Sequence, residues 1–189
     1  MNGGAALLLV VKFLAGGVTG LTVHESGHVM TSAAFGAHPG TKPINYAGIP
    51  FFAVTHQQVS RKREFIISSA GLWTQHADSE LILTKRPDIR HESAPFLKGV
   101  LAFNTVTSAV YATAAFGKLG PPERDTLGMA QSLGQHGWRE PSIGVFVLAP
   151  AAFDVYRYFR PDRKWAAWAS RGSKAVFMAL VLFAGRPVS

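Results

Sequence analysis

His24, Glu25 and His28 belong to a short motif, HESGH, whose residue types and spacing suit metal-dependent chemistry. Residues four positions apart on a helix lie on one face, one turn above the other, so both imidazoles can bind a single Zn²⁺ ion. A carboxylate beside them can take a proton from a water molecule whose pKa the metal has lowered to about 7, and can pass that proton to a leaving amine. The motif therefore predicts hydrolysis, most often of a peptide bond, with Glu25 as the general base.

The motif follows the longest apolar run of the chain, residues 4–23, which is long enough to cross a bilayer as a helix. Ionisable side chains beside hydrocarbon are costly unless they are paired or bound to metal, which favours metal ligation over histidines that only hydrogen-bond to neighbours. Gly16 and Gly20 form a GxxxG pattern that lets another helix approach closely, and Gly27 offers similar room inside the motif. We expect a retained membrane helix, since a charged n-region and an A-x-A cleavage site are missing.

The composition of the chain also indicates a membrane protein. Apolar residues make up 48% of the 189 residues and charged residues 16%, against roughly 25% charged in an average soluble domain. The net charge of +8 suits Lys and Arg side chains that meet anionic headgroups, and no basic cluster interleaved with aromatic residues indicates nucleic-acid binding. The chain has no cysteine, so any metal must bind to His, Asp or Glu. We expect one integral membrane domain, residues 1–189, in the bacterial cytoplasmic (inner) membrane.

Further apolar segments predict an all-α membrane protein, a bundle of four to five transmembrane helices. One of them carries a polar stripe, Asn104, Thr107, Ser108 and Tyr111, which we expect to face the bundle, with Asn104 joining helices. Another contains Pro150, which predicts a kink or break. The loop between the first two helices, residues 38–63, is rich in Pro and Gly and predicts turns with one or two strands at the membrane surface. The apolar segments after the first are residues 65–84, 95–117, 141–159 and 165–184.

Two short motifs of the chain, HESGH and SSAGL, resemble motifs of a known family. HESGH has the HExGH form of the site-2 protease family of intramembrane zinc metallopeptidases, and SSAGL at residues 68–72 resembles the Ala-Gly motif that begins that family's next core helix. The order of motif helix, strand-containing loop, Ala-Gly helix and later aspartate is similar over about residues 5–130. The resemblance implies cleavage of a membrane-embedded or membrane-adjacent peptide, with His24 and His28 as zinc ligands and Glu25 as general base.

The chain departs from the family at the third zinc ligand. The family supplies an aspartate from an Asn-x-x-Pro…Leu-Asp-Gly element, and that element does not occur here. Asp125 follows a Pro-Pro pair and, by order and spacing, is the predicted third ligand. The alternative for this residue is that Glu123 and Asp125 only complement the N-terminus of a helix that begins at Pro121.

Two other acids compete with Asp125 for this role. Asp154 lies in an apolar run, although Arg157, three residues later, offers it a local ion pair. Glu80 lies one helical turn after His76, on the same stripe of its helix.

Competing functions remain open. HESGH also fits HxxxH, the first histidine box of membrane di-iron desaturases and hydroxylases, but the further HxxHH boxes of those enzymes are missing. A catalytically inactive membrane scaffold or escort protein that retains the peptidase-like core is the stronger alternative, because the family's third motif is missing. The expected partners are the lipid bilayer and a membrane-protein or membrane-adjacent peptide substrate, with no nucleic acid, and the sequence leaves the oligomeric state open.

Overall fold

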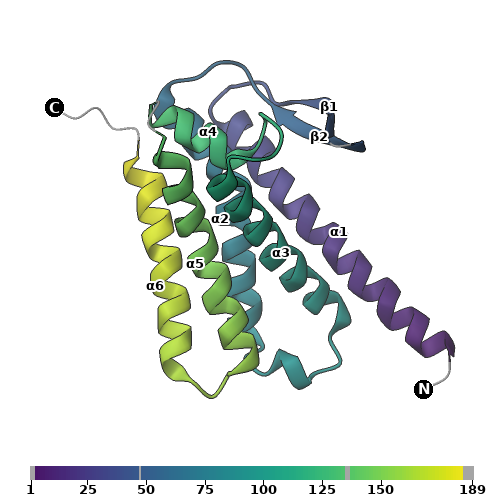
Figure 1. Cartoon of the computed structure of the whole chain (residues 1–189). Helices are drawn as coiled ribbons and strands as arrows, with labels where there is room; N and C mark the ends of the chain where they lie inside the picture. Colours follow the sequence, from purple (N-terminus) through teal and green to yellow (C-terminus); the bar gives the residue numbers. More distant parts are fainter. Residues whose placement is uncertain (1–2, 47, 135–136, 185–189) are drawn as a thin grey trace.

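The computed structural model describes residues 3–46, 48–134 and 137–184, which form a mostly helical bundle with a small sheet at one end (Figure 1). The expected helical architecture, with a strand-containing loop after the first helix, is confirmed. In chain order the described elements are α1 (Gly3–Ala34), β1 (Gly40–Tyr46), β2 (Ile49–Thr55), α2 (Arg61–Lys85), the 3₁₀-helix η1 (Ile89–His91), α3 (Pro95–Gly117), α4 (Asp125–Ser132), α5 (Arg139–Phe159) and α6 (Lys164–Phe183).

Helix α1 contains both the apolar run and the HESGH motif in one continuous helix. Its buried residues are small or belong to the motif, so its backbone comes close to its neighbours. A Cβ atom on Gly16 would collide with the carbonyl oxygen of Phe96 in α3, and one on Gly20 would lie 2.7 Å from the Phe103 ring. The expected close packing at the GxxxG pattern is therefore confirmed. Toward its N-terminus α1 leans away from the other helices (Figure 1).

Of the described helices, α1 and α3 are long and apolar enough to cross a membrane. The expectation of four to five membrane spans is thus not confirmed. Helices α2, α5 and α6 each carry charged residues, such as Glu80, Asp154 and Lys174, which lower their mean hydropathy. Those charges bind one another across helices: Arg157 lies 2.9 Å from Glu80, and Lys174 lies 2.9 Å from Glu80 and 2.7 Å from Asp154.

The break allowed for at Pro150 and the local ion pair between Asp154 and Arg157 are not found in α5. Pro150 lies inside the helix, but the helix is not broken there and runs from Arg139 to Phe159. Asp154 and Arg157 do not form a local pair. Instead, Asp154 accepts hydrogen bonds from Ser170 and Lys174 of α6, while Arg157 donates to Glu80 and Thr84 of α2. Contacts between helices replace the predicted contact along one helix.

The sheet and α4 lie at the same end of the bundle (Figure 1). Strands β1 and β2 pair antiparallel from Gly40 opposite Thr55 to Tyr46 opposite Ile49. The expectation of strands in the 38–63 loop is confirmed. A core of buried apolar side chains joins α2, α4, α5 and α6 below this end, and its members include Phe65, Leu72, Met129, Val147 and Phe177. This core packs α4 against α2. It thereby fixes the position of Asp125, the first residue of α4.

Candidate metal centre

His24 and His28 project from the bundle-facing side of α1, where they are 2% and 6% exposed. Their spacing of four residues places them one helical turn apart, as the sequence predicts. Their Nε2 atoms lie 3.3 Å from each other. The two nitrogen atoms therefore face one point in space between α1 and α4.

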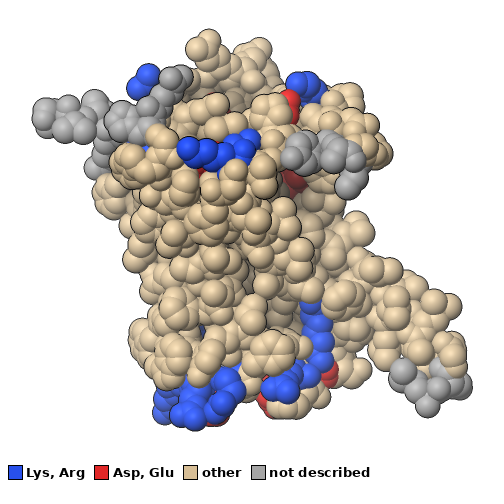
Figure 2. All heavy atoms as spheres, in the orientation of Figure 1, with Lys and Arg blue, Asp and Glu red and all other residues tan. Residues whose placement is uncertain are grey.

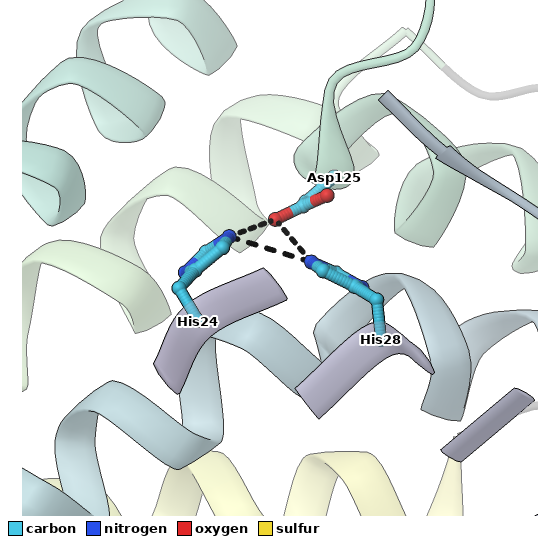
Figure 3. Close-up of side chains that lie close together, drawn as sticks. All are labelled: His24, His28 and Asp125. Atoms are coloured by element: carbon cyan, nitrogen blue, oxygen red, sulfur yellow. Dashed lines mark hydrogen bonds and ion pairs between the residues drawn. The ribbon is translucent and has the colours of Figure 1, made fainter. Parts of the chain in front are cut away.

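Asp125 is the first residue of α4, and its carboxylate points toward the two imidazoles (Figure 3). Its Oδ2 atom lies 3.1 Å from His24 Nε2 and 3.3 Å from His28 Nε2. Among the described residues, these three form the one group of His, Asp or Glu side chains arranged to hold a metal ion.

The spacing of these three atoms suits zinc. Ligand atoms about 2.0–2.1 Å from a tetrahedral zinc ion lie about 3.3 Å from one another. The three separations here are 3.1, 3.3 and 3.3 Å. Three protein ligands leave the fourth tetrahedral position open, which is the arrangement of catalytic rather than structural zinc sites.

The other nitrogen of each imidazole faces a fixed acceptor. His28 Nδ1 lies 2.8 Å from the carbonyl oxygen of Ile67, which can only accept, so Nδ1 carries a proton and Nε2 is the nitrogen that faces Asp125. His24 Nδ1 lies 2.9 Å from Oε1 of Gln75. Partners of this kind hold metal-binding histidines in one tautomer and orientation. Both Nε2 atoms are consequently prepared to act as ligands.

The orientation of the Gln75 amide is set by α3. Its Nε2 donates to the backbone carbonyl of Asn104 at 3.2 Å and to Ser108 Oγ at 2.6 Å, which leaves Oε1 to accept from His24. Asn104 in turn donates to Ser79 Oγ and to the Gln75 carbonyl, joining α3 to α2. The polar stripe of α3 therefore faces the bundle, as predicted. Its last member, Tyr111, stacks on the His24 ring with centroids 5.9 Å apart.

The two motifs that carry the family resemblance meet at this site. A Cβ atom on Gly71, the glycine of SSAGL, would collide with the Nε2 atoms of His24 and His28. A Cβ atom on Gly27, within HESGH, would lie 2.7 Å from the carbonyl oxygen of Ala70. Each glycine is required because the other helix occupies the space of its side chain. The two imidazoles thus pack directly against the backbone of α2 at Gly71, and Gly27 packs against the neighbouring Ala70.

Glu25 is half-buried and lines a cavity of about 760 Å³ together with the three candidate ligands. Most of the cavity wall is apolar. It is formed by α1, β2, α3 and the segment before α4, and includes Leu21, Phe51, Phe52, Phe103 and Val110. The carboxylate that sequence predicts as general base therefore lies at the end of an apolar chamber that leads to the candidate metal site.

A second pocket, of about 270 Å³, reaches His28 and Asp125 from another side. Its wall is more polar than that of the first cavity and includes His56, Glu64 and Gln131. The candidate metal site thus lies between an apolar chamber and a polar pocket.

Asp125 is suited to ligation by its charge as well as its position. Burial opposes ionisation of this carboxyl. His28 and His24 outweigh that effect through their charge and their hydrogen bonds, and they hold the pKa of Asp125 below its usual range. The alternative role, in which Glu123 and Asp125 complement the N-terminus of a helix that begins at Pro121, fits Asp125 alone, because this residue lies in the first turn of α4. Helix α4 begins at Asp125 itself, and Glu123 pairs with Lys42 of β1 at 2.9 Å.

The other two acids do not reach the histidines. Glu80 binds Arg157, Arg171 and Lys174, and Asp154 binds Lys174. His76, which shares a stripe with Glu80, is buried and packs edge-on against Phe177 with centroids 5.5 Å apart. Of the three candidates, the structure brings only Asp125 to His24 and His28. That these residues bind zinc stays a prediction.

The partners that orient the histidines are the part of the site that the sequence analysis does not identify. Gln75 is visible in the sequence as an amide amid an apolar segment, which requires a polar partner. Its role as partner of His24 depends on the packing of α1 against α2, which no local pattern encodes. The Ile67 carbonyl belongs to the backbone and has no sequence signal at all.

Comparison of the chain with protein-family models, curated proteins and solved structures found no match. The resemblance to site-2 proteases therefore rests on HESGH, on SSAGL and on the order of elements. The contact between these two motifs at Gly27 and Gly71 is the structural feature that joins them.

Proposed function

We propose that this protein is a zinc-dependent, membrane-embedded peptidase that hydrolyses peptide bonds within or beside the bilayer. The observation that carries the proposal is the arrangement of His24 Nε2, His28 Nε2 and Asp125 Oδ2, at separations of 3.1–3.3 Å, with both Nδ1 atoms held by acceptors. Two buried imidazoles whose Nε2 atoms converge on one carboxylate oxygen form a site at which a divalent cation can bind. The similarity of HESGH and SSAGL to the site-2 protease motifs supports the same function.

The reaction follows from the groups around this point. Zinc, when bound by the three side chains, supplies a Lewis acid that lowers the pKa of a water molecule to about 7. Glu25, in the same cavity, takes the proton from the attacking water and delivers it to the leaving amine. Tyr111, stacked on His24, restricts that imidazole from the side of α3. The apolar cavity wall accommodates a peptide whose side chains are drawn from a membrane segment.

We further propose that α2, α5 and α6 cross the membrane together with α1 and α3, which gives a five-span bundle in the bacterial inner membrane. On the face shown in Figure 2, Lys and Arg side chains gather at both ends of the bundle and the band between them is almost free of charge. Charged residues make α2, α5 and α6 less apolar than α1 and α3. Glu80, Asp154, Arg157 and Lys174 pair with one another across these helices, which lowers the cost of placing them in a bilayer. Helices α5 and α6 also expose large apolar side chains, Val145, Val176 and Leu182 among them.

The test of this function is peptide cleavage by the purified, zinc-loaded protein in vesicles. A library of single-span membrane peptides is incubated with the wild type and with Glu25→Gln, which preserves the shape of the side chain but removes its basicity. We expect cleavage by the wild type, and loss of at least a hundredfold in rate with zinc retained in the variant. Equal cleavage by both proteins would contradict the role of Glu25. A wild type that holds zinc and cleaves nothing would favour a scaffold or escort protein.

A further inference from the structure

The residues on both sides of Asp125 bind the same carboxylate of another helix. Arg124 donates from Nε to Glu140 Oε1 at 2.7 Å and from Nη2 to Oε2 at 3.0 Å. Thr126 donates from Oγ1 to Glu140 Oε1 at 3.1 Å. Glu140 lies in the first turn of α5, so one side chain of α5 holds the chain immediately before and immediately after the candidate ligand.

These contacts are buried, and they restrict both the position and the orientation of the groups that they join. The side chains of Arg124 and Glu140 are 10% and 8% exposed, and Thr126 is fully buried. A two-pronged guanidinium–carboxylate pair fixes both position and orientation, unlike a single hydrogen bond. Arg124 also donates from Nη1 to the Pro121 carbonyl at 3.1 Å, which ties the preceding loop to the same cluster.

Nothing local to α4 fixes Asp125 in the same way. The helix has eight residues, and its N-cap residue, Arg124, makes no side-chain capping bond. The Asp125 carboxylate must be held in place for its Oδ2 to complete the triangle with the histidine nitrogens, because metal affinity depends on ligand geometry within a few tenths of an ångström. The Glu140 contacts supply that restraint from outside the site.

We propose that Glu140 is a positioning residue of the metal site, which holds Asp125 in ligating position through Arg124 and Thr126 and so makes zinc affinity depend on α5. The inference rests on the proposed function in that it requires a metal at His24, His28 and Asp125. It goes beyond that function because Glu140 touches neither metal nor substrate. Groups that orient metal ligands change affinity by about 10- to 100-fold when they are removed.

The test compares zinc and cobalt binding by purified variants in detergent. Glu140→Gln replaces one carboxylate oxygen with an amide that faces the Arg124 guanidinium, and Thr126→Val removes one hydrogen bond with little change of shape. Glu80→Gln is the matched control, because it breaks a partly buried ion-pair cluster of α2, α5 and α6 that does not include the ligands. The thermal stability of each metal-free variant is measured alongside the zinc Kd and the visible spectrum of the cobalt form.

We expect Glu140→Gln to weaken zinc binding about 10- to 100-fold, Thr126→Val to weaken it less, and both to alter the cobalt spectrum. Glu80→Gln lowers stability but leaves the Kd and spectrum unchanged. If Glu140→Gln does not fold, Thr126→Val alone decides. Wild-type Kd and spectrum in the folded Glu140 and Thr126 variants would overturn this inference and leave the proposed function standing. A wild type that binds no metal would overturn both, and equal weakening by Glu80→Gln would show that general destabilisation is the cause.

Discussion

At the scale of single residues, each candidate ligand is held by a second group that leaves one ligand atom available. The Ile67 carbonyl and the Gln75 amide accept from the Nδ1 atoms of His28 and His24, and thereby direct both Nε2 atoms at Asp125. Because the Gln75 amide is oriented by a backbone carbonyl of α3, the tautomer of His24 depends on the contact between α2 and α3. Metal affinity is therefore a property of this chain of contacts as well as of the ligands.

Replacement of Gln75 by Leu tests the first of these contacts. The change removes the acceptor for His24 Nδ1 and leaves its N–H buried without a partner, so we expect zinc affinity to fall about 10- to 100-fold. The measurement is a competitive zinc titration of the purified protein. Gln57→Leu is the control, because Gln57 is exposed and lines neither of the two pockets that reach the ligands. Equal zinc affinity in the wild type and Gln75→Leu would show that His24 needs no such partner.

The glycine beneath the imidazoles gives a second prediction at this scale. In Gly71→Ala the added methyl group collides with both Nε2 atoms, so we expect zinc binding to be lost while the helix itself is retained. Gly172→Ala in α6 is the control, since a Cβ atom there meets nothing within 4 Å. Zinc content of the two purified variants, with circular dichroism as the check on helicity, distinguishes the outcomes. A Gly71→Ala protein with full zinc content would place the ligands elsewhere.

At the scale of elements, α1 and α3 are joined by a reciprocal contact of backbones. A Cβ atom on Gly16 would collide with the Phe96 carbonyl, and one on Gly99 would collide with the carbonyl of Phe13. These two glycines let the helices approach closely in a setting where apolar burial gives little preference for one helix over lipid. Their contact also fixes the wall of the apolar cavity that α1 and α3 share.

Gly99→Ala tests this contact. The methyl group forces α3 away from α1, and we expect a loss of about 1–3 kcal/mol in the free energy of unfolding, the usual cost of overpacking. Gly17→Ala, also in α1 but facing open space, provides the comparison and should be neutral or slightly stabilising. Thermal unfolding in detergent is the measurement. If both variants melt alike, the close crossing of α1 and α3 does not stabilise the protein.

The sequence predicts local features of this fold better than contacts between helices. The spacing of His24, Glu25 and His28 is sufficient to place them on a single helix, and the order of motifs is sufficient to choose Asp125. Arg157 shows where such reasoning fails. Its neighbour Asp154 is an adequate partner by sequence, yet the structure pairs Arg157 with Glu80 because α2 and α5 pack together. The number of spans is hard to predict for the same reason, since charges paired across helices look unfavourable in each helix alone.

At the scale of the whole molecule, charge is arranged in layers. Basic side chains gather at the two ends of the bundle in Figure 2, the uncharged band lies between them, and the candidate site lies toward the end that carries the sheet and α4. The ionised groups around Glu80 are paired with one another across α2, α5 and α6. This arrangement suits a bundle set across a bilayer with its site near one surface.

Because the chain contains no cysteine, single introduced cysteines can test this arrangement directly. Lys62→Cys and Lys164→Cys lie at exposed positions at the starts of α2 and α6, and Val176→Cys lies at an exposed apolar position inside α6. In sealed vesicles we expect a membrane-impermeant maleimide to label Lys62→Cys and Lys164→Cys from opposite sides, and to leave Val176→Cys unlabelled. Detergent-solubilised protein is the control for reactivity. Labelling of all three from one side would show that α6 does not cross the bilayer.

The central claim is that His24, His28 and Asp125 hold one zinc ion. The most direct measurement is the zinc content of the purified wild type beside that of Asp125→Ala and Asp154→Asn, each after equilibration with micromolar zinc and removal of the excess. We predict one zinc ion per wild-type chain and per Asp154→Asn chain, and loss of tightly bound zinc from Asp125→Ala. A wild type without zinc, or an Asp125→Ala variant that binds it unchanged, would contradict the claim.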